Sequence, residues 1–244
     1  MGKNYKFNQN YFDVIDTEDK AYWIGFIWCD GYLGHRKRKL IKKDGEGIRD
    51  EYNLKISLHK DDYGHLEKFN KCIDGNYPIN FYKTTGFDMI SYESRIFITN
   101  KYMGELLENK YGIVPRRHDC SKLISHIPDN LFRHFIRGVL DADGSIAVYM
   151  AKDRGYISKK YTVSFGTTPS IINYIEKFLI KHNIIDDFER KKSKRHQEEH
   201  RDINYRVLNI CGQRQVEKTL DYIYKDATIY LDRKYEKYIN EFKK

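Results

Sequence analysis

The sequence has few of the features that mark membrane, secreted or zinc-binding proteins. No apolar run among its 244 residues approaches the roughly 20 that a bilayer span needs. Residues 1–20 are polar and contain no apolar core of a secretory signal. The four cysteines are scattered without a C-x-x-C pair, which argues against structural zinc and suits a reducing compartment. We expect a protein without a membrane partner that is not secreted and works in the cytoplasm.

Basic side chains outnumber acidic ones. There are 44 Lys and Arg against 35 Asp and Glu, for a formal net charge of +9. Such a surface concentrates polyanions and speeds encounter with them. Ribosomal, nucleic-acid-binding and anionic-membrane proteins share this property, and so do basic proteins without a polyanionic partner. The hydrophobic fraction of 40% excludes disorder, and the length suits one large domain or two small ones.

The chain shows the same order of expected elements twice. The first set is a helix at 21–31, a strand at 51–60, a helix at 61–73, a hairpin at 76–99 turning at Thr84-Thr85-Gly86, and a helix at 100–113. The second set is a helix at 131–144, strands at 145–150 and 159–167, a helix at 169–184, a strand pair at 185–210, and helices at the start and end of 212–242. Matching positions lie 109 to 117 residues apart, which indicates two α+β units, 1–118 and 119–244, related by a pseudo-two-fold axis. Such a chain resembles a fused homodimer, so we expect a monomer.

The first helix of each unit combines a small-residue stripe with an acid at its C-terminal end. The stripes are formed by Gly25 with Cys29 and by Gly138 with Ala142. Packing the stripes together would bring Asp30 and Asp143 to one place. A carboxylate at the negative end of a helix dipole is unfavourable unless a cation binds there. A plain Asp-Gly turn is the alternative, and it would explain one copy better than two.

The two motifs, WIGFIWCDG at 23–31 and IRGVLDADG at 136–144, resemble the motif of the LAGLIDADG homing endonucleases. In the first copy Trp28 and Cys29 replace the sixth and seventh letters. The resemblance extends over roughly residues 10–244. It implies an α+β fold of two pseudo-symmetric αββαββα repeats that form a DNA-binding saddle.

The resemblance also implies a metal-dependent endodeoxyribonuclease that hydrolyses one phosphodiester per strand of a long, partly palindromic duplex. Such an enzyme would work in the cytoplasm or wherever the host genome lies. Asp30 and Asp143, with the backbone carbonyl regions of Gly31 and Gly144, would hold Mg²⁺. Mn²⁺ would substitute, and Ca²⁺ would support binding without cleavage. Asp141 would be a helix-end acid and not a ligand. Two alternatives stay open on the same scaffold: a maturase that binds intron RNA, and a DNA-binding regulator that does not cut.

A basic residue late in each repeat would stabilise the transition state, according to the same resemblance. The matching residues are Lys234 and either Arg117 or Arg116. An arginine departs from the usual lysine and cannot act as a base, so the two cleavage centres would be unequal. A polar residue that positions water would match Leu58 or His59 in the first repeat and Thr167 in the second.

Basic and polar side chains would contact the duplex. We place the basic ones in three loops, between the first two strands of each unit and in the last hairpin: Arg36, Lys37, Arg38 and Lys39; Lys152, Arg154, Lys159 and Lys160; and Arg190, Lys191, Lys192, Lys194 and Arg195. Alternating strand positions would read bases: Lys55, Ser57, Lys83, Arg95, Thr162, Ser164 and Arg206, with Asn53, Tyr82 and Tyr205. A solvated charged surface is the alternative for the basic runs.

Overall fold

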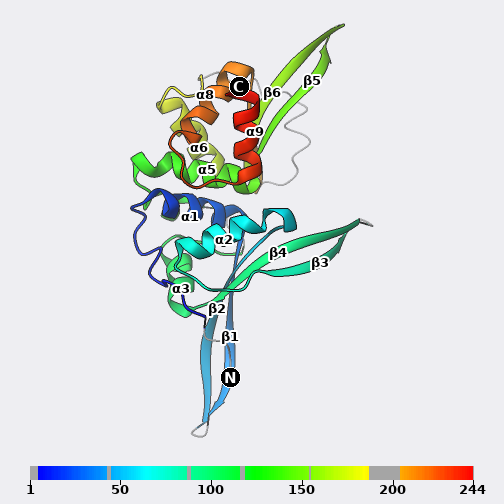
Figure 1. Cartoon of the computed structure of the whole chain (residues 1–244). Coiled ribbons are helices and arrows are strands. Elements are labelled where there is room, and N and C mark those ends of the chain that lie inside the picture. The colour runs from blue at the N-terminus through cyan, green and yellow to red at the C-terminus, as the bar shows by residue number, and fades with distance from the viewer. Residues whose placement is uncertain are drawn as a thin grey trace.

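Two helices packed backbone to backbone form the centre of the molecule. The computed structural model describes residues 5–42, 45–86, 89–115, 119–153, 155–186 and 204–243. Helices α1 (Glu18–Asp30) and α5 (Phe132–Asp143) lie side by side between the two halves (Figure 1). A Cβ on Gly25 would lie 2.5 Å from the carbonyl oxygen of Phe135, and one on Gly138 would collide with that of Tyr22. The predicted close contact through small residues is therefore confirmed at both glycines.

The first half contains a four-stranded antiparallel sheet. Its strands are β1 (Gly31–Lys42), β2 (Gly45–His59), β3 (Asn80–Gly86) and β4 (Met89–Thr99), in the order β1-β2-β4-β3. A short 3₁₀ turn (Lys60–Asp62) leads into α2 (Tyr63–Cys72), and α3 (Lys101–Asn109) follows β4. Leu54, Ile56 and Ile96 are buried on the face that these helices cover. Lys55 and its neighbours in register point to the opposite, open face.

The second half repeats this plan with an extra helix. Its described strands are β5 (Ser145–Asp153), β6 (Tyr156–Thr167) and β7 (Arg206–Cys211), in the order β5-β6-β7. Its helices are α6 (Pro169–Lys181), α8 (Gln213–Tyr224) and α9 (Asp232–Phe242), and the link between the halves holds α4 (Ser121–Ile124) and a 3₁₀ turn (Asp129–Leu131). The expected strand before β7 falls largely on 187–203, outside the described residues.

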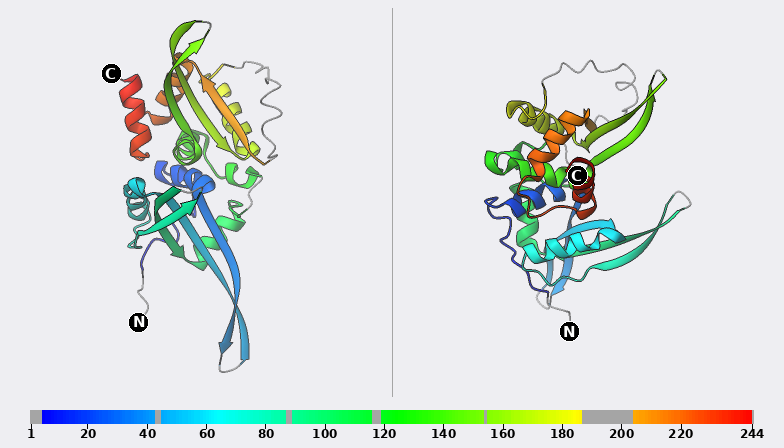
Figure 2. Two further views of the ribbon diagram at one scale, coloured as in Figure 1. Left: turned by 90° about the vertical axis from the view of Figure 1, so that its right-hand side faces the viewer. Right: turned by 45° about the horizontal axis from the view of Figure 1, so that its top comes forward.

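The β1–β2 and β5–β6 hairpins extend from the central helices toward opposite ends of the molecule, and β3–β4 extends to the side (Figures 1 and 2). The first half follows the order αββαββα, and the described elements of the second half follow the same order with one strand fewer and with α9 added at the end. The predicted α+β architecture of two related repeats is confirmed. None of the helices in the described part of the chain has the length and apolarity that a bilayer span requires.

Two placements made from the sequence are wrong. Thr84 and Gly86 belong to β3 and pair with Ser91 and Met89, so the hairpin turns beyond the Thr-Thr-Gly stretch. The basic residues expected in loops lie inside strands: Arg36 to Lys39 in β1, Lys152 in β5, and Lys159 with Lys160 in β6. These strand ends extend past the covering helices (Figure 1), so both of their faces are exposed and no alternation of buried apolar and exposed polar residues marks them as strands.

Candidate active site and nucleic-acid interface

The two motif acids end the two central helices. Asp30 is the last residue of α1, which passes directly into β1, and Asp143 is the last residue of α5, which Gly144 alone separates from β5. The glycines that follow, Gly31 and Gly144, have φ of −80° and −93°, so neither adopts the left-handed conformation of a glycine-terminated helix. The simple turn interpretation therefore does not describe either motif.

Lys234 lies beside both acids, at the C-terminal end of α5. Its ammonium donates hydrogen bonds of 2.7 Å to each of three carbonyl oxygens, those of Leu140, Asp141 and Gly144. An ammonium has three hydrogens, so all of its donors are in use. The charge compensates the negative end of the α5 dipole, where Asp143 also sits.

The electrostatics of Lys234 reflect this position. Burial lowers its pKa to about 8, while the carboxylates of Asp141, Asp30 and Asp143 oppose the shift. In the predicted transition-state role, the Lys234 ammonium would therefore act as a positive charge near both acids. A direct hydrogen bond to a phosphate would require it to break one of its three hydrogen bonds to carbonyl oxygens. The carbonyl of Gly144, expected in the metal region, is one of those that Lys234 engages.

Asp141 points into the interior and holds the two halves together. Its carboxylate accepts hydrogen bonds from the Tyr22 hydroxyl of α1 (2.9 Å), the Tyr224 hydroxyl of α8 (2.9 Å) and the backbone N–H of Leu231 (2.8 Å). Burial raises the pKa of Asp141, although Lys234 and these donors stabilise the charged form. Asp141 is thus an interior structural acid, a role that the sequence did not reveal.

His65 of α2 extends this network. The Tyr22 hydroxyl has one hydrogen, which Asp141 receives, so His65 Nε2 is the donor in the 2.8 Å contact with Tyr22. Burial lowers the pKa of His65 to about 3, so its ring is neutral. Trp28 occupies the first-motif position that corresponds to Asp141, so the two motif surroundings differ.

A buried ion pair also crosses between the halves. The Arg137 guanidinium, which is fully buried, donates to Glu18 of α1 at 2.6 Å and to the carbonyl oxygens of Ile223 (2.7 Å) and Ile229 (2.8 Å). The sequence offered no sign of this pair, because Glu18 lies outside the motif and far from Arg137 in the chain.

The candidates for positioning water lie in different surroundings. Thr167 is buried at the end of β6, and the Cys29 thiol donates to its hydroxyl at 3.8 Å. Leu58 faces the core, while His59 is exposed and caps the following 3₁₀ turn. Thr167 is the candidate that the structure brings next to the opposite motif. Its role in catalysis stays a prediction.

Several predicted residues fall outside the described part of the chain. These are Arg116, Arg117, Arg154, Arg190, Lys191, Lys192, Lys194 and Arg195.

The open face of the first sheet carries part of the predicted interface. Register and alternation place Arg36, Arg38, Lys55, Ser57 and Arg95 on this face. Their side chains are held in place: Arg36 and Arg38 pair with Glu51, Arg95 with Glu93 (2.9 Å) and the ring of Tyr82 (4.5 Å), and Lys55 lies over Tyr32 (5.1 Å). Lys37, Lys39 and Lys83 fall on the opposite face.

The predicted interface residues of the second sheet are also divided between its two faces. Lys160, Thr162 and Ser164 alternate on the open face. Lys152, Lys159 and Arg206 have the other parity. Lys159 pairs with Glu241 of α9 at 2.8 Å, and Arg206 with Glu176 of α6 at 3.0 Å. These two carboxylates come from helices whose approach to the sheet the sequence did not indicate.

Tyr205, expected to read bases, lies next to the acid of the second motif. Its ring covers Gly166 on β6. Burial raises the pKa of Tyr205, and the negative charge of Asp143 adds to the shift. The phenol therefore lies near the end of the second motif.

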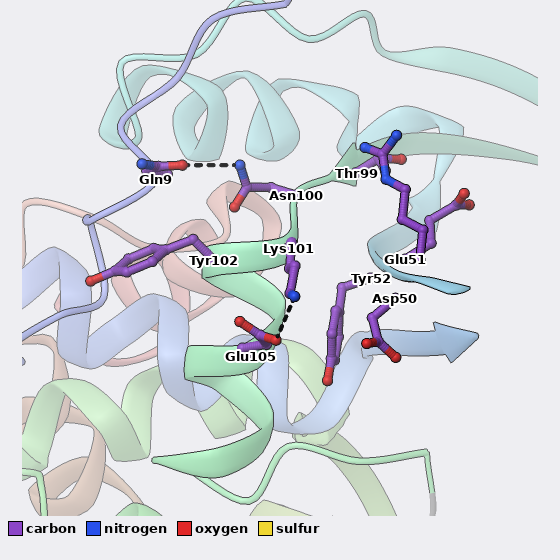
Figure 3. A pocket seen from close by; sticks show the side chains of 10 residues that line it. Gln9, Asp50, Glu51, Tyr52, Thr99, Asn100, Lys101, Tyr102 and Glu105 are labelled. Atoms are coloured by element: carbon purple, nitrogen blue, oxygen red, sulfur yellow. Dashed lines mark hydrogen bonds and ion pairs between the residues drawn. The ribbon is translucent and has the colours of Figure 1, made fainter. Parts of the chain in front are cut away.

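A separate pocket of about 450 Å³ lies at the base of the β1–β2 hairpin (Figure 3). Charged residues of both signs line it, including Asp50, Glu51, Glu105 and Lys101. Lys101 pairs with Glu105, and the polar lining offers neither a nucleophile–base pair nor a uniform charge. Its β2 residues lie five or more positions from Ser57, so the pocket is distinct from the site of the motif acids.

The metal-binding capacity of the motif region comes from carboxylates and carbonyls. Within the described ranges no three His, Cys, Asp or Glu side chains form a metal cluster. Two acids near each other nevertheless fit Mg²⁺, which commonly binds one or two carboxylates and completes its shell with water and substrate phosphate. The donor set suits a hard cation used together with a phosphate substrate.

Comparison with solved structures identifies the fold. The chain matches I-SmaMI bound to DNA with a TM-score of 0.56 at 14% identity, over 92% of this chain and 90% of that one. It matches I-AabMI bound to DNA with a TM-score of 0.52 at 16% identity, over 90% of this chain and 88% of that one. It matches I-CpaMI bound to DNA with a TM-score of 0.54 at 10% identity, over 90% of this chain and 89% of that one. No protein-family model and no curated protein matches the sequence. The architecture is thus that of the meganucleases in these structures. Within that class, the chain has the fold of the single-chain LAGLIDADG homing endonucleases.

Proposed function

We propose that this protein is a site-specific, double-strand DNA endonuclease of the homing type. The observation that carries the proposal is the meeting of Asp30 and Asp143 beside the Lys234 ammonium, where the two central helices end. The solved structures of similar fold include I-SmaMI bound to cleaved DNA and to an uncleaved target with calcium ions. These comparisons support DNA as the substrate.

The carboxylates of Asp30 and Asp143 would hold divalent metal, with Mg²⁺ as the natural ion and Mn²⁺ as a substitute. A bound metal supplies Lewis acidity and lowers the pKa of a coordinated water. The residues of the chain would do the rest. Lys234 balances the charge of the two acids, and basic side chains on the open faces hold the phosphates of the duplex.

The two open faces differ in side chains, so the duplex halves that they contact should differ too. Ser57 lies opposite Arg95 in the first sheet, while Gly166 lies opposite Val207 in the second. We therefore infer a target that is only partly palindromic. Residues 1–118 and 119–244 would each contact one half of it, and a single chain would suffice.

The test is a pooled duplex selection. Random and genomic duplexes are bound in Ca²⁺, the complexes are switched to Mg²⁺, and the cut ends are sequenced. We expect staggered cuts within one long site, lost in Asp143→Asn while binding in Ca²⁺ persists. Specific binding without cutting would identify a regulator. Failure to select any duplex, together with selection of intron RNA in a parallel pool, would identify a maturase.

A further inference from the structure

Tyr205 has a fixed position on the open face of the second sheet. It directly precedes β7, and its ring lies over Gly166 of the neighbouring strand. A Cβ on Gly166 would lie 2.9 Å from the phenol ring carbon Cζ and would collide with the hydroxyl. The missing side chain at Gly166 thus provides the space for the phenol, which is 44% exposed.

The same position is adjacent to Asp143. The β5–β6 ladder pairs Ser145 with Ser164 in antiparallel register. Asp143 lies two residues before Ser145, as the last residue of α5, and a Cβ on the intervening Gly144 would lie 2.8 Å from the Ser164 carbonyl oxygen, so the end of α5 lies against β6 near Gly166. The Tyr205 hydroxyl above Gly166 therefore lies near the end of α5, and the negative charge of Asp143 raises the pKa of Tyr205.

We propose that Tyr205 is a further catalytic residue of the Asp143 centre, donating its O–H hydrogen bond to a non-bridging oxygen of the phosphate cut there. This inference rests on the proposed nuclease function. The attacking water oxygen bonds to phosphorus, one P–O ester bond breaks, and the leaving sugar oxygen takes a proton from water. Tyr205 keeps its proton and stabilises charge that grows on the phosphate oxygens.

The first centre lacks this group. The β2–β4 register pairs Ile56 with Ile96, as the β6–β7 register pairs Phe165 with Leu208. The place of Tyr205 is accordingly taken by Glu93, which pairs with Arg95 at 2.9 Å. A phenol serves one centre and a guanidinium–carboxylate pair the other, so loss of the phenol should affect one strand of the duplex.

The test is strand-resolved cleavage by Tyr205→Phe, which keeps the ring over Gly166 and removes the hydroxyl. The duplex recovered by the selection carries a different dye on each strand and is cut under single-turnover conditions in Mg²⁺. The matched control is Tyr174→Phe, which removes an exposed phenol from α6, on the covered side of the sheet and away from the open face. We expect Tyr205→Phe to slow one strand about tenfold, the effect of one lost hydrogen bond. The other strand and the affinity in Ca²⁺ should be unchanged, and Tyr174→Phe should cut both strands at the parental rates.

Three results would overturn the inference. Parental rates on both strands would show that the hydroxyl is idle while leaving the nuclease function intact. Equal slowing of both strands, or weaker binding in Ca²⁺, would assign Tyr205 to duplex binding. A parental chain that cuts no selected duplex would remove the proposed function and this inference together.

Discussion

His65 is a buried histidine that stays neutral in the folded chain. Burial holds its pKa at about 3, below the ordinary value of 6.5. Between these two values the unfolded chain binds more protons than the folded chain, so the free energy of unfolding falls as pH drops from 6.5 toward 3. At neutral pH the titration of His65 therefore does not lower the free energy of unfolding, and the neutral ring donates a hydrogen bond to Tyr22.

The His65→Asn variant tests this linkage. At pH above 7 we expect it to be less stable than the parent, because it loses the buried ring. Near pH 5 the parent should have lost about 2 kcal/mol that the variant does not lose, so the difference in unfolding free energy should narrow by that amount. Urea unfolding at both pH values measures it. A difference that does not change with pH would show that His65 titrates alike in both states.

At the scale of elements, the contact of α1 with α5 depends on two glycines. Gly138→Ala would push its methyl group into the Tyr22 carbonyl oxygen, and the helices would have to separate. We expect a loss of about 1–3 kcal/mol of unfolding free energy. The matched control is Gly64→Ala in α2, where the nearest atom to a new Cβ is 3.9 Å away and the substitution should not destabilise the chain. Equal effects of the two substitutions would contradict the close packing.

The sequence predicted the elements that have an apolar face. α5, α2 and β6 show periodic apolar residues and α1 a continuous apolar run, because each packs against a core. β1 and the first part of β2 were missed as strands. They pair Arg36 with Glu51 and Lys37 with Asp50, so opposite charges and not apolar contacts join them. A pattern of burial cannot reveal a hairpin that is exposed on both faces.

The candidate site was predicted in part for a similar reason. Asp30 and Asp143 are evident from the repeated motif and its resemblance to a family. The surroundings of the acids depend on which distant segments pack together. The pairing of β5, β6 and β7 brings Tyr205 near Asp143, and Lys234 of α9 contacts the end of α5. Contacts between such distant segments have no signature in one sequence.

For the whole molecule, the net charge of +9 should strengthen binding of the proposed duplex only where basic side chains lie on the open faces. Lys160 is exposed on the open face, whereas its neighbour Lys159 pairs with Glu241 on the other face. We expect Lys160→Ala to reduce the slope of log affinity against log salt by about 1, and Lys159→Ala to leave it unchanged. Titrations of the selected duplex in Ca²⁺ at several salt concentrations measure both slopes. Equal changes in the two salt slopes would contradict the assignment of Lys160, and not Lys159, to the open face.

The polar contacts between α1 and α5 are directional. Tyr22 donates to Asp141, but the positions that correspond to them in the other motif helix hold Phe135 and Trp28. The ion pair between the halves is directional in the same way: Arg137 pairs with Glu18, and the corresponding positions of the other motif helix hold Ile24 and Leu131. Two copies of the first half would place Tyr22 against an indole, and two copies of the second would bury Asp141 against a phenyl ring. Each half is therefore complementary to the other and not to itself, so neither half should form a stable symmetric dimer with a second copy of itself.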